Sequence, residues 1–126
     1  MIGEGVPRRS ILIVDDEFGL AEMVREMLIE LGYEVALAIN GRLALAVLRD
    51  RRVDVVLADV MMPVMDGPEL ARAIRADERY RHVRIIFMTS LPSGVPHESG
   101  LYEMVLRKPF TPEALLRAIE EPTRRF

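Results

Sequence analysis

The chain has 126 residues, which is enough for one domain with a buried hydrophobic core that needs no disulfides or structural metals. It has no cysteine, which excludes disulfides and thiolate metal sites, and its net charge of −3 gives no support for a direct nucleic-acid partner, because arginine and glutamate are interspersed. No apolar run is long enough to span a bilayer, and the first residues lack a signal-peptide core, so we expect a cytoplasmic protein without membrane insertion.

Short apolar runs and amphipathic helical stripes alternate five times along the chain. The first helical stripe carries Leu20, Val24, Met27, Leu28 and Leu31 and stops at Gly32, a typical C-terminal glycine. The expected strands are 10–14, 33–38, 53–58, 83–88 and 103–107, and the expected helices are 18–31, 41 to about 51, 67 to about 77 and 112–121, the last capped by Thr111.

Residues 91–100 are the one stretch that resists assignment to a regular element. Two prolines (Pro92 and Pro96) and two glycines (Gly94 and Gly100) fall within it. An interior proline costs a helix about 3 kcal/mol and a glycine about 1 kcal/mol. We therefore expect a short or irregular segment where the alternation would place a fourth helix.

The alternation of strands and helices predicts an α/β fold. We expect a flavodoxin-like, doubly wound, five-stranded parallel sheet of order 2-1-3-4-5 with helices on both faces. The domain should span 10–121, with a flexible lead-in at 1–9 and a short tail at 122–126. We expect no output domain in this chain.

Polar side chains follow four of the predicted strands, where open α/β sheets bind ligands. Asp15 and Asp16 follow the first strand, Asp59 the third, Thr89 the fourth and Lys108 the fifth. Of the seventeen basic residues, only Lys108 is a lysine. Three carboxylates held close together repel one another unless a cation lies among them, and an all-oxygen ligand set suits Mg²⁺.

Four sequence blocks, together and in this order, resemble the receiver domain of two-component response regulators. They are Ile11 to Glu17, the stretch from Asp59 to Asp66-Gly67, Met88-Thr89-Ser90, and Lys108-Pro109-Phe110, and they extend over almost the whole chain. The resemblance is to a single-domain receiver.

The resemblance implies a role for each site residue. Asp15, Asp16, Asp59 and the backbone carbonyl of Met61 would hold Mg²⁺, and Asp59 would be the phosphoacceptor. Thr89 and Lys108 would bind phosphoryl oxygens. Glu17 is interpreted as a neighbour of the site or as an acid of the first helical turn.

The function implied is that of a phosphoacceptor signalling domain, not of an enzyme with a separate substrate. The implied partners are a sensor histidine kinase or histidine phosphotransfer protein and a downstream protein that the sequence does not name. One departure from the family concerns Val105, where receivers tend to have an aromatic side chain that swings inward. We therefore hypothesise that signalling orders residues 91–101 instead.

Three alternative functions have sequence requirements that can be compared with this chain. A phosphatase of the haloacid dehalogenase type needs a second Asp two positions after the first, and that position is Met61. A degenerate receiver would lack one of the acidic residues or the lysine, and none is missing. A flavodoxin-like nucleotide-binding domain would have a glycine-rich loop after the first strand, which this chain lacks.

Overall fold

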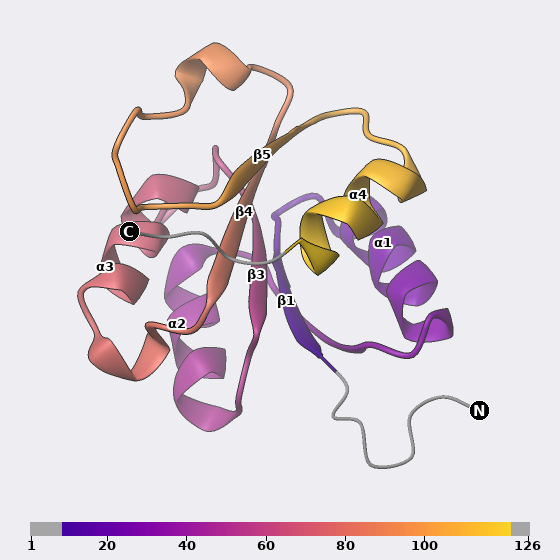
Figure 1. Cartoon of the computed structure of the whole chain (residues 1–126), viewed down its shortest axis with the longest axis horizontal. Coiled ribbons are helices and arrows are strands. Elements are labelled where there is room, and N and C mark those ends of the chain that lie inside the picture. Colours follow the sequence, from indigo (N-terminus) through magenta and orange to yellow (C-terminus); the bar gives the residue numbers. More distant parts are fainter. Residues whose placement is uncertain (1–8, 122–126) are drawn as a thin grey trace.

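A five-stranded parallel sheet organises residues 9–121, the part of the chain that the computed structural model describes (Figure 1). The strand order is β2-β1-β3-β4-β5, which confirms the predicted order. The strands are β1 (Ser10–Val14), β2 (Glu34–Ala38), β3 (Val55–Asp59), β4 (Arg84–Thr89) and β5 (Met104–Arg107). The helices are α1 (Phe18–Glu30), α2 (Gly41–Asp50), α3 (Gly67–Arg75) and α4 (Pro112–Glu120), with 3-10 turns η1 (Glu78–Tyr80) and η2 (Pro92–Gly94).

The expected domain limits are only partly covered by these residues. Residues 1–8 of the predicted lead-in and the predicted tail 122–126 lie outside the described part of the chain, so that division stays a prediction. Within residues 9–121, no helix combines the length and the apolar composition needed to cross a membrane.

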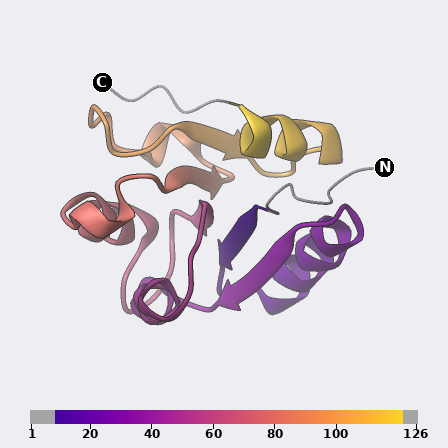
Figure 2. The same cartoon turned by 60° about the horizontal axis from the view of Figure 1, so that its bottom comes forward.

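Helices cover both faces of the sheet. Helices α2 and α3 lie on one face and α1 and α4 on the other (Figures 1 and 2). Every residue of β1, β3 and β4 is buried, which explains why these strands are nearly continuous apolar runs. Alternate residues of β1 divide between two cores: Leu12 joins the core beneath α2 and α3, and Ile13 joins the core beneath α1 and α4. Strand β2 lies at an edge of the sheet, and Ala38 is its one buried residue.

Side-chain caps fix where three of the helices begin. Asn40, Asp66 and Thr111 each accept a hydrogen bond from the backbone N–H three residues later. Asp66 forms a reciprocal capping box with Glu69. These caps follow the carboxyl ends of β2, β3 and β5, so they set the loops around that edge of the sheet.

Local predictions of where elements end differ from the structure. The third and fourth strands run through Asp59 and Thr89, so each of these residues is the last of its strand and not the residue after it. Leu31 was expected on the buried stripe of the first helix but is 53% exposed. The reason is that α1 ends at Glu30 and Gly32, with φ of 98°, turns the chain away.

The connection between β4 and β5 contains no α-helix in the structure, which confirms the predicted irregular segment. Only the short turn η2 interrupts it. Val95 and Leu101 bury their side chains and take over part of the covering that a helix would provide. The Tyr102 hydroxyl donates to the Pro96 carbonyl at 2.9 Å, and its ring lies 4.8 Å from the ring of Phe87.

An arginine on α3 holds the far end of this segment in place. Arg75 donates to the carbonyls of Val83 (2.8 Å) and Leu101 (3.2 Å) and pairs with Glu103 at 2.9 Å. Glu103 in turn accepts the N–H of Ile85 at 2.7 Å. A charge-assisted network therefore attaches the start of β5 to α3 and β4 without a helix between them.

Amide hydrogen exchange is expected to distinguish this segment from the true helices. Amides of 92–101 should exchange much faster than those of 112–120, because few of them belong to a continuous hydrogen-bond ladder. Exchange monitored by mass spectrometry or NMR on the unmodified protein measures this, with 112–120 as the internal reference. Equal protection of both regions would mean that a regular helix forms here in solution.

Candidate functional site

The carboxyl ends of the strands bring the predicted site residues to one edge of the sheet. In the β3–β4 register, Asp59 is level with Met88, immediately before Thr89. In the β4–β5 register, Thr89 is level with Arg107, immediately before Lys108. Asp59 and Lys108, 49 positions apart in the sequence, therefore become neighbours through parallel pairing alone.

The ammonium of Lys108 lies among three carboxylates. Its Nζ is 3.2 Å from Asp59 Oδ2, 3.3 Å from Asp15 Oδ2 and 3.4 Å from Glu17 Oε1. The Asp15 and Asp59 residues are buried, at 2% and 9% exposure, whereas the Glu17 side chain is 65% exposed. The site is thus a buried acidic pair closed by one cation, with a third acid at its mouth.

Burial governs the protonation of this group. Desolvation raises the pKa of Asp59, the Lys108 ammonium opposes that rise, and Asp15 adds to it by like-charge repulsion. Burial also opposes the charged form of Lys108, but the carboxylates of Asp15 and Asp59 outweigh it and raise the lysine's pKa. Lys108 therefore stays charged, and ionised Asp59 is held at a cost in folding free energy.

The structure groups the acids differently from the sequence prediction. Carboxylate oxygens of Asp15, Glu17 and Asp59 lie within 4.8 Å of one another, close enough to surround one metal ion. Asp16 is exposed and does not belong to this group, and Met61 is also exposed. The predicted ligand roles of Asp16 and of the Met61 carbonyl stay predictions.

The sequence predicts for Glu17 either a place beside the site or a role as an acid of the first helical turn, and the structure places its carboxylate at the site. The sequence signal is its position directly after two acids in the strand-to-helix turn.

The Thr89 hydroxyl is oriented by the chain that follows it. Its Oγ1 accepts a hydrogen bond from the N–H of Leu91 at 3.0 Å. A hydroxyl that accepts in this way can still donate its own proton to another group. The Thr89 carbonyl also accepts the N–H of Lys108 at 2.8 Å, so both residues are set by one local bond.

The loop after β3 packs tightly against the backbone of Asp59. A Cβ on Gly67 would lie 2.5 Å from the Asp59 carbonyl oxygen, so only glycine fits there. Val64 in the same loop has φ of 74°, a left-handed conformation that is strained for a β-branched residue. The backbone behind Asp59 is consequently held by close contact rather than left loose.

The Lys108–Pro109 peptide bond is cis.

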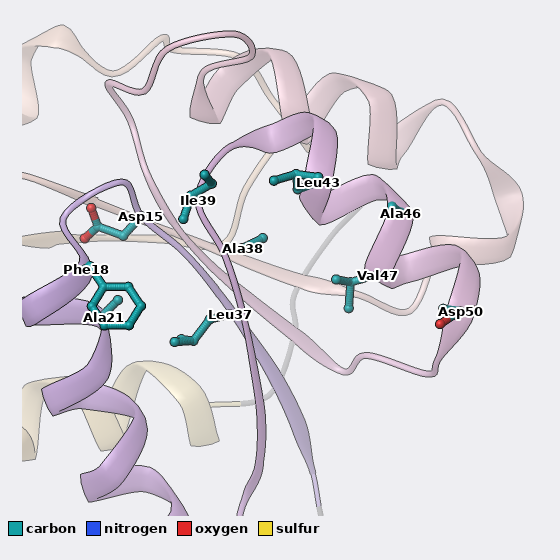
Figure 3. A pocket seen from close by; sticks show the side chains of 10 residues that line it. All are labelled: Asp15, Phe18, Ala21, Leu37, Ala38, Ile39, Leu43, Ala46, Val47 and Asp50. Atoms are coloured by element: carbon teal, nitrogen blue, oxygen red, sulfur yellow. The ribbon is translucent and has the colours of Figure 1, made fainter.

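An apolar cavity of about 530 Å³ opens beside Asp15, between α1 and α2 (Figure 3). Phe18, Ile39 and Leu43 line it and are each about half exposed or more. Asp15 contributes to its lining at the end nearest the acidic site. The acidic site therefore adjoins an exposed apolar surface.

Comparison with known proteins identifies the family. The model of the response regulator receiver domain matches residues 11–120. The DNA-binding response regulator MtrA of Mycolicibacterium paratuberculosis is 36% identical over 122 residues, covering 94% of this chain and 52% of MtrA. The chain thus spans about half the length of the curated relatives it matches.

Solved structures agree with this match. The chemotaxis response regulator CheY4 of Vibrio cholerae is 35% identical with a TM-score of 0.79, covering 90% of this chain and 98% of that one. The receiver domain of sensor histidine kinase PA1611 from Pseudomonas aeruginosa PAO1, which has a magnesium ion coordinated in its active site cleft, is 33% identical with a TM-score of 0.80, covering 90% and 96%. Strand order, the acidic site at the strand ends and the match over nearly the whole described chain agree, and the chain belongs to the response regulator receiver domain family.

Proposed function

We propose that Asp59 accepts a phosphoryl group from a phosphohistidine of a sensor histidine kinase or histidine phosphotransfer protein, in a reaction that uses Mg²⁺. The aspartyl phosphate then changes the binding of this domain to a downstream protein. The observation that carries the proposal is the position of the Asp59 carboxylate, with Lys108 Nζ at 3.2 Å and Asp15 beside it.

The chemistry assigned to Asp59 is nucleophilic displacement at phosphorus. A carboxylate oxygen of Asp59 forms the new O–P bond as the P–N bond to the donor imidazole breaks, and the imidazole keeps the electron pair. The reaction needs ionised Asp59, and the neighbouring Lys108 ammonium favours that form. No proton has to leave the nucleophile.

The residues present fit a hard divalent cation. The grouped ligands are carboxylate oxygens only, and they are close enough to share one ion. Asp15 and Asp59 would hold Mg²⁺, with Asp16 and the Met61 carbonyl as the further ligands implied by the family resemblance. Bound there, the ion neutralises charge on the phosphoryl oxygens. The magnesium in the PA1611 receiver domain supports this assignment.

Thr89 and Lys108 are proposed to bind the phosphoryl oxygens. The Thr89 hydroxyl keeps a proton to donate while Leu91 N–H holds its oxygen, and Lys108 supplies a compact charge. Movement of Thr89 toward the phosphoryl group would act on Leu91 and so on the irregular segment. We infer that ordering of 91–101 transmits the signal, since Val105 is too small to reproduce an aromatic swing.

A protein donor is supported by the surface around the site. The apolar side chains of Phe18, Ile39 and Leu43 beside Asp15 provide area for a protein to dock while its histidine reaches Asp59. The downstream target is proposed to be a protein. The cytoplasmic location and the absence of direct nucleic-acid contact stay predictions.

Asp59→Asn is expected to abolish phosphoryl uptake without loss of the fold, because an amide is nearly isosteric but is not a nucleophile. A small phosphodonor with Mg²⁺, followed by intact mass spectrometry and hydroxylamine treatment, measures this. Asp50→Asn, a carboxylate change away from the predicted phosphoacceptor, is the control. Undiminished hydroxylamine-sensitive phosphate on the Asp59→Asn variant would disprove the assignment.

The same variant is expected to unfold at a higher temperature than wild type at pH 7. The raised pKa means that the fold favours protonated Asp59, so stability is fully present at low pH and is lost as pH rises through that pKa. The advantage of the amide should therefore shrink as the solution is acidified. Thermal unfolding of both proteins, followed by circular dichroism from pH 7 down to acidic pH, measures whether the stability difference shrinks as expected.

Replacing Asp15 and Asp16 together with Asn is expected to weaken Mg²⁺ binding by roughly ten-fold or more, since ligand charge sets affinity for hard cations. Isothermal titration with MgCl₂ measures it, with Asp50→Asn as the control for loss of a carboxylate elsewhere. If the double variant binds Mg²⁺ with the same affinity as wild type, neither Asp15 nor Asp16 is a metal ligand.

Lys108→Arg is expected to impair phosphorylation although it keeps the charge. The guanidinium is a wide planar fork, whereas the space between Asp15 and Asp59 holds a compact ammonium at 3.2 to 3.3 Å. Initial rates with a small phosphodonor at saturating Mg²⁺ provide the measurement. Rates and partner binding equal to wild type would contradict the requirement for lysine.

A further inference from the structure

We propose that Glu17 is a positioning residue for Lys108. Its carboxylate holds the ammonium at the mouth of the site in the unmodified protein and releases it when Asp59 carries a phosphoryl group. This inference rests on the proposed function of Asp59 and adds a residue that controls the lysine.

The three acids around Lys108 differ in how freely they can move. The side chains of Asp15 and Asp59 are 1% and 12% exposed, and both residues are fixed at the ends of central strands. The Glu17 side chain is 65% exposed and makes its contact to Lys108 at 3.4 Å from the solvent side. Glu17 is therefore the partner that can leave without uncovering a buried charge.

The backbone of Glu17 is held while its side chain is left to reach Lys108. Its N–H donates to Asp15 Oδ1 at 2.9 Å, and its carbonyl accepts the N–H of Ala21 at 3.1 Å. Glu17 occupies the N-cap position of α1, yet its side chain makes no capping hydrogen bond. Its carboxylate bonds to the lysine, which lies 91 positions away in the sequence.

The number of donors on the ammonium forces an exchange. Lys108 has three N–H donors, and its Nζ lies within hydrogen-bonding distance of three carboxylates. A phosphoryl oxygen on Asp59 needs one of these donors. The bond to exposed Glu17 is the one that can be given up at least cost, so Glu17 sets how readily Lys108 turns toward the phosphoryl group.

The single lysine of the chain makes this contact directly measurable. Lys108 is the only lysine, so acylation by an amine reagent, located by peptide mass spectrometry, separates it from the N-terminal amine. The rate of Lys108 acylation is first measured on the full, unphosphorylated chain, with a metal chelator and no phosphodonor. The variants are Glu17→Gln, Glu17→Asp and, as an equal charge change on the exposed side of the same helix, Glu26→Gln.

Loss of the contact should expose the amine. We expect Lys108 in Glu17→Gln to react about two- to five-fold faster than in wild type, the range that an ion pair with one exposed member supports. Glu17→Asp should partly restore the wild-type rate, and Glu26→Gln should match wild type. Asp59→Asn, which removes a different Lys108 contact, shows that the assay responds.

Two results would overturn the role of Glu17. One is a wild-type rate in Glu17→Gln while Asp59→Asn reacts faster, and the other is equal acceleration in Glu17→Gln and Glu26→Gln, which would reflect net charge alone. In protein phosphorylated by a small phosphodonor, Glu17→Gln and wild type should react equally, and a persistent difference would exclude release. Failure of wild type to take up phosphate is a separate readout, and it would count against the proposed function of Asp59.

Discussion

Two buried carboxylates that share one ammonium form the interaction on which the rest of the site depends. Asp15 and Asp59 lie at the ends of neighbouring central strands, and burial together with mutual repulsion raises the pKa of Asp59. The compensating charge comes from Lys108, directly after the edge strand β5. Because the Lys108 N–H bonds to the Thr89 carbonyl, pairing of β5 with β4 is what delivers the cation. The edge strand β5 therefore supplies the charge that the site requires and also packs against β4.

That requirement gives the irregular connection before β5 its importance. With no helix in this connection, other contacts must place the strand, and Arg75 does so by reaching Leu101 and Glu103 from α3. The Glu103 side chain is only 4% exposed, and such a group is stable only when paired and hydrogen-bonded. Its bond to the Ile85 N–H completes the link to β4. The position of Lys108 thus depends on an ion pair at the opposite end of β5.

The sheet and the core of the site were predictable because they follow from local patterns. Apolar runs followed by Asp15, Asp59, Thr89 and Lys108 imply parallel strands whose carboxyl ends lie side by side. The observed pairing of β3 with β4 and of β4 with β5 brings these ends together. The exposure of Leu31 was not predicted, since a stripe does not show that the helix ends one residue earlier. The contacts of Arg75 and Glu17 join residues from 8 to 91 positions apart, and no periodicity encodes such pairs. Side chains that cross between elements are visible only once the fold fixes their distance.

Residues 89–95 connect the site to the surface of the protein. The Thr89 oxygen is held by the N–H of Leu91, and the turn η2 begins at the next residue. A helix at this place would resist a shift of Thr89 through its own hydrogen-bond ladder, whereas a single 3-10 turn has little ladder to break. Leu91 is 68% exposed, so its displacement changes the surface directly without repacking the core. The same prolines and glycines that prevent a helix here therefore leave Leu91 and the residues after it without a helical hydrogen-bond ladder.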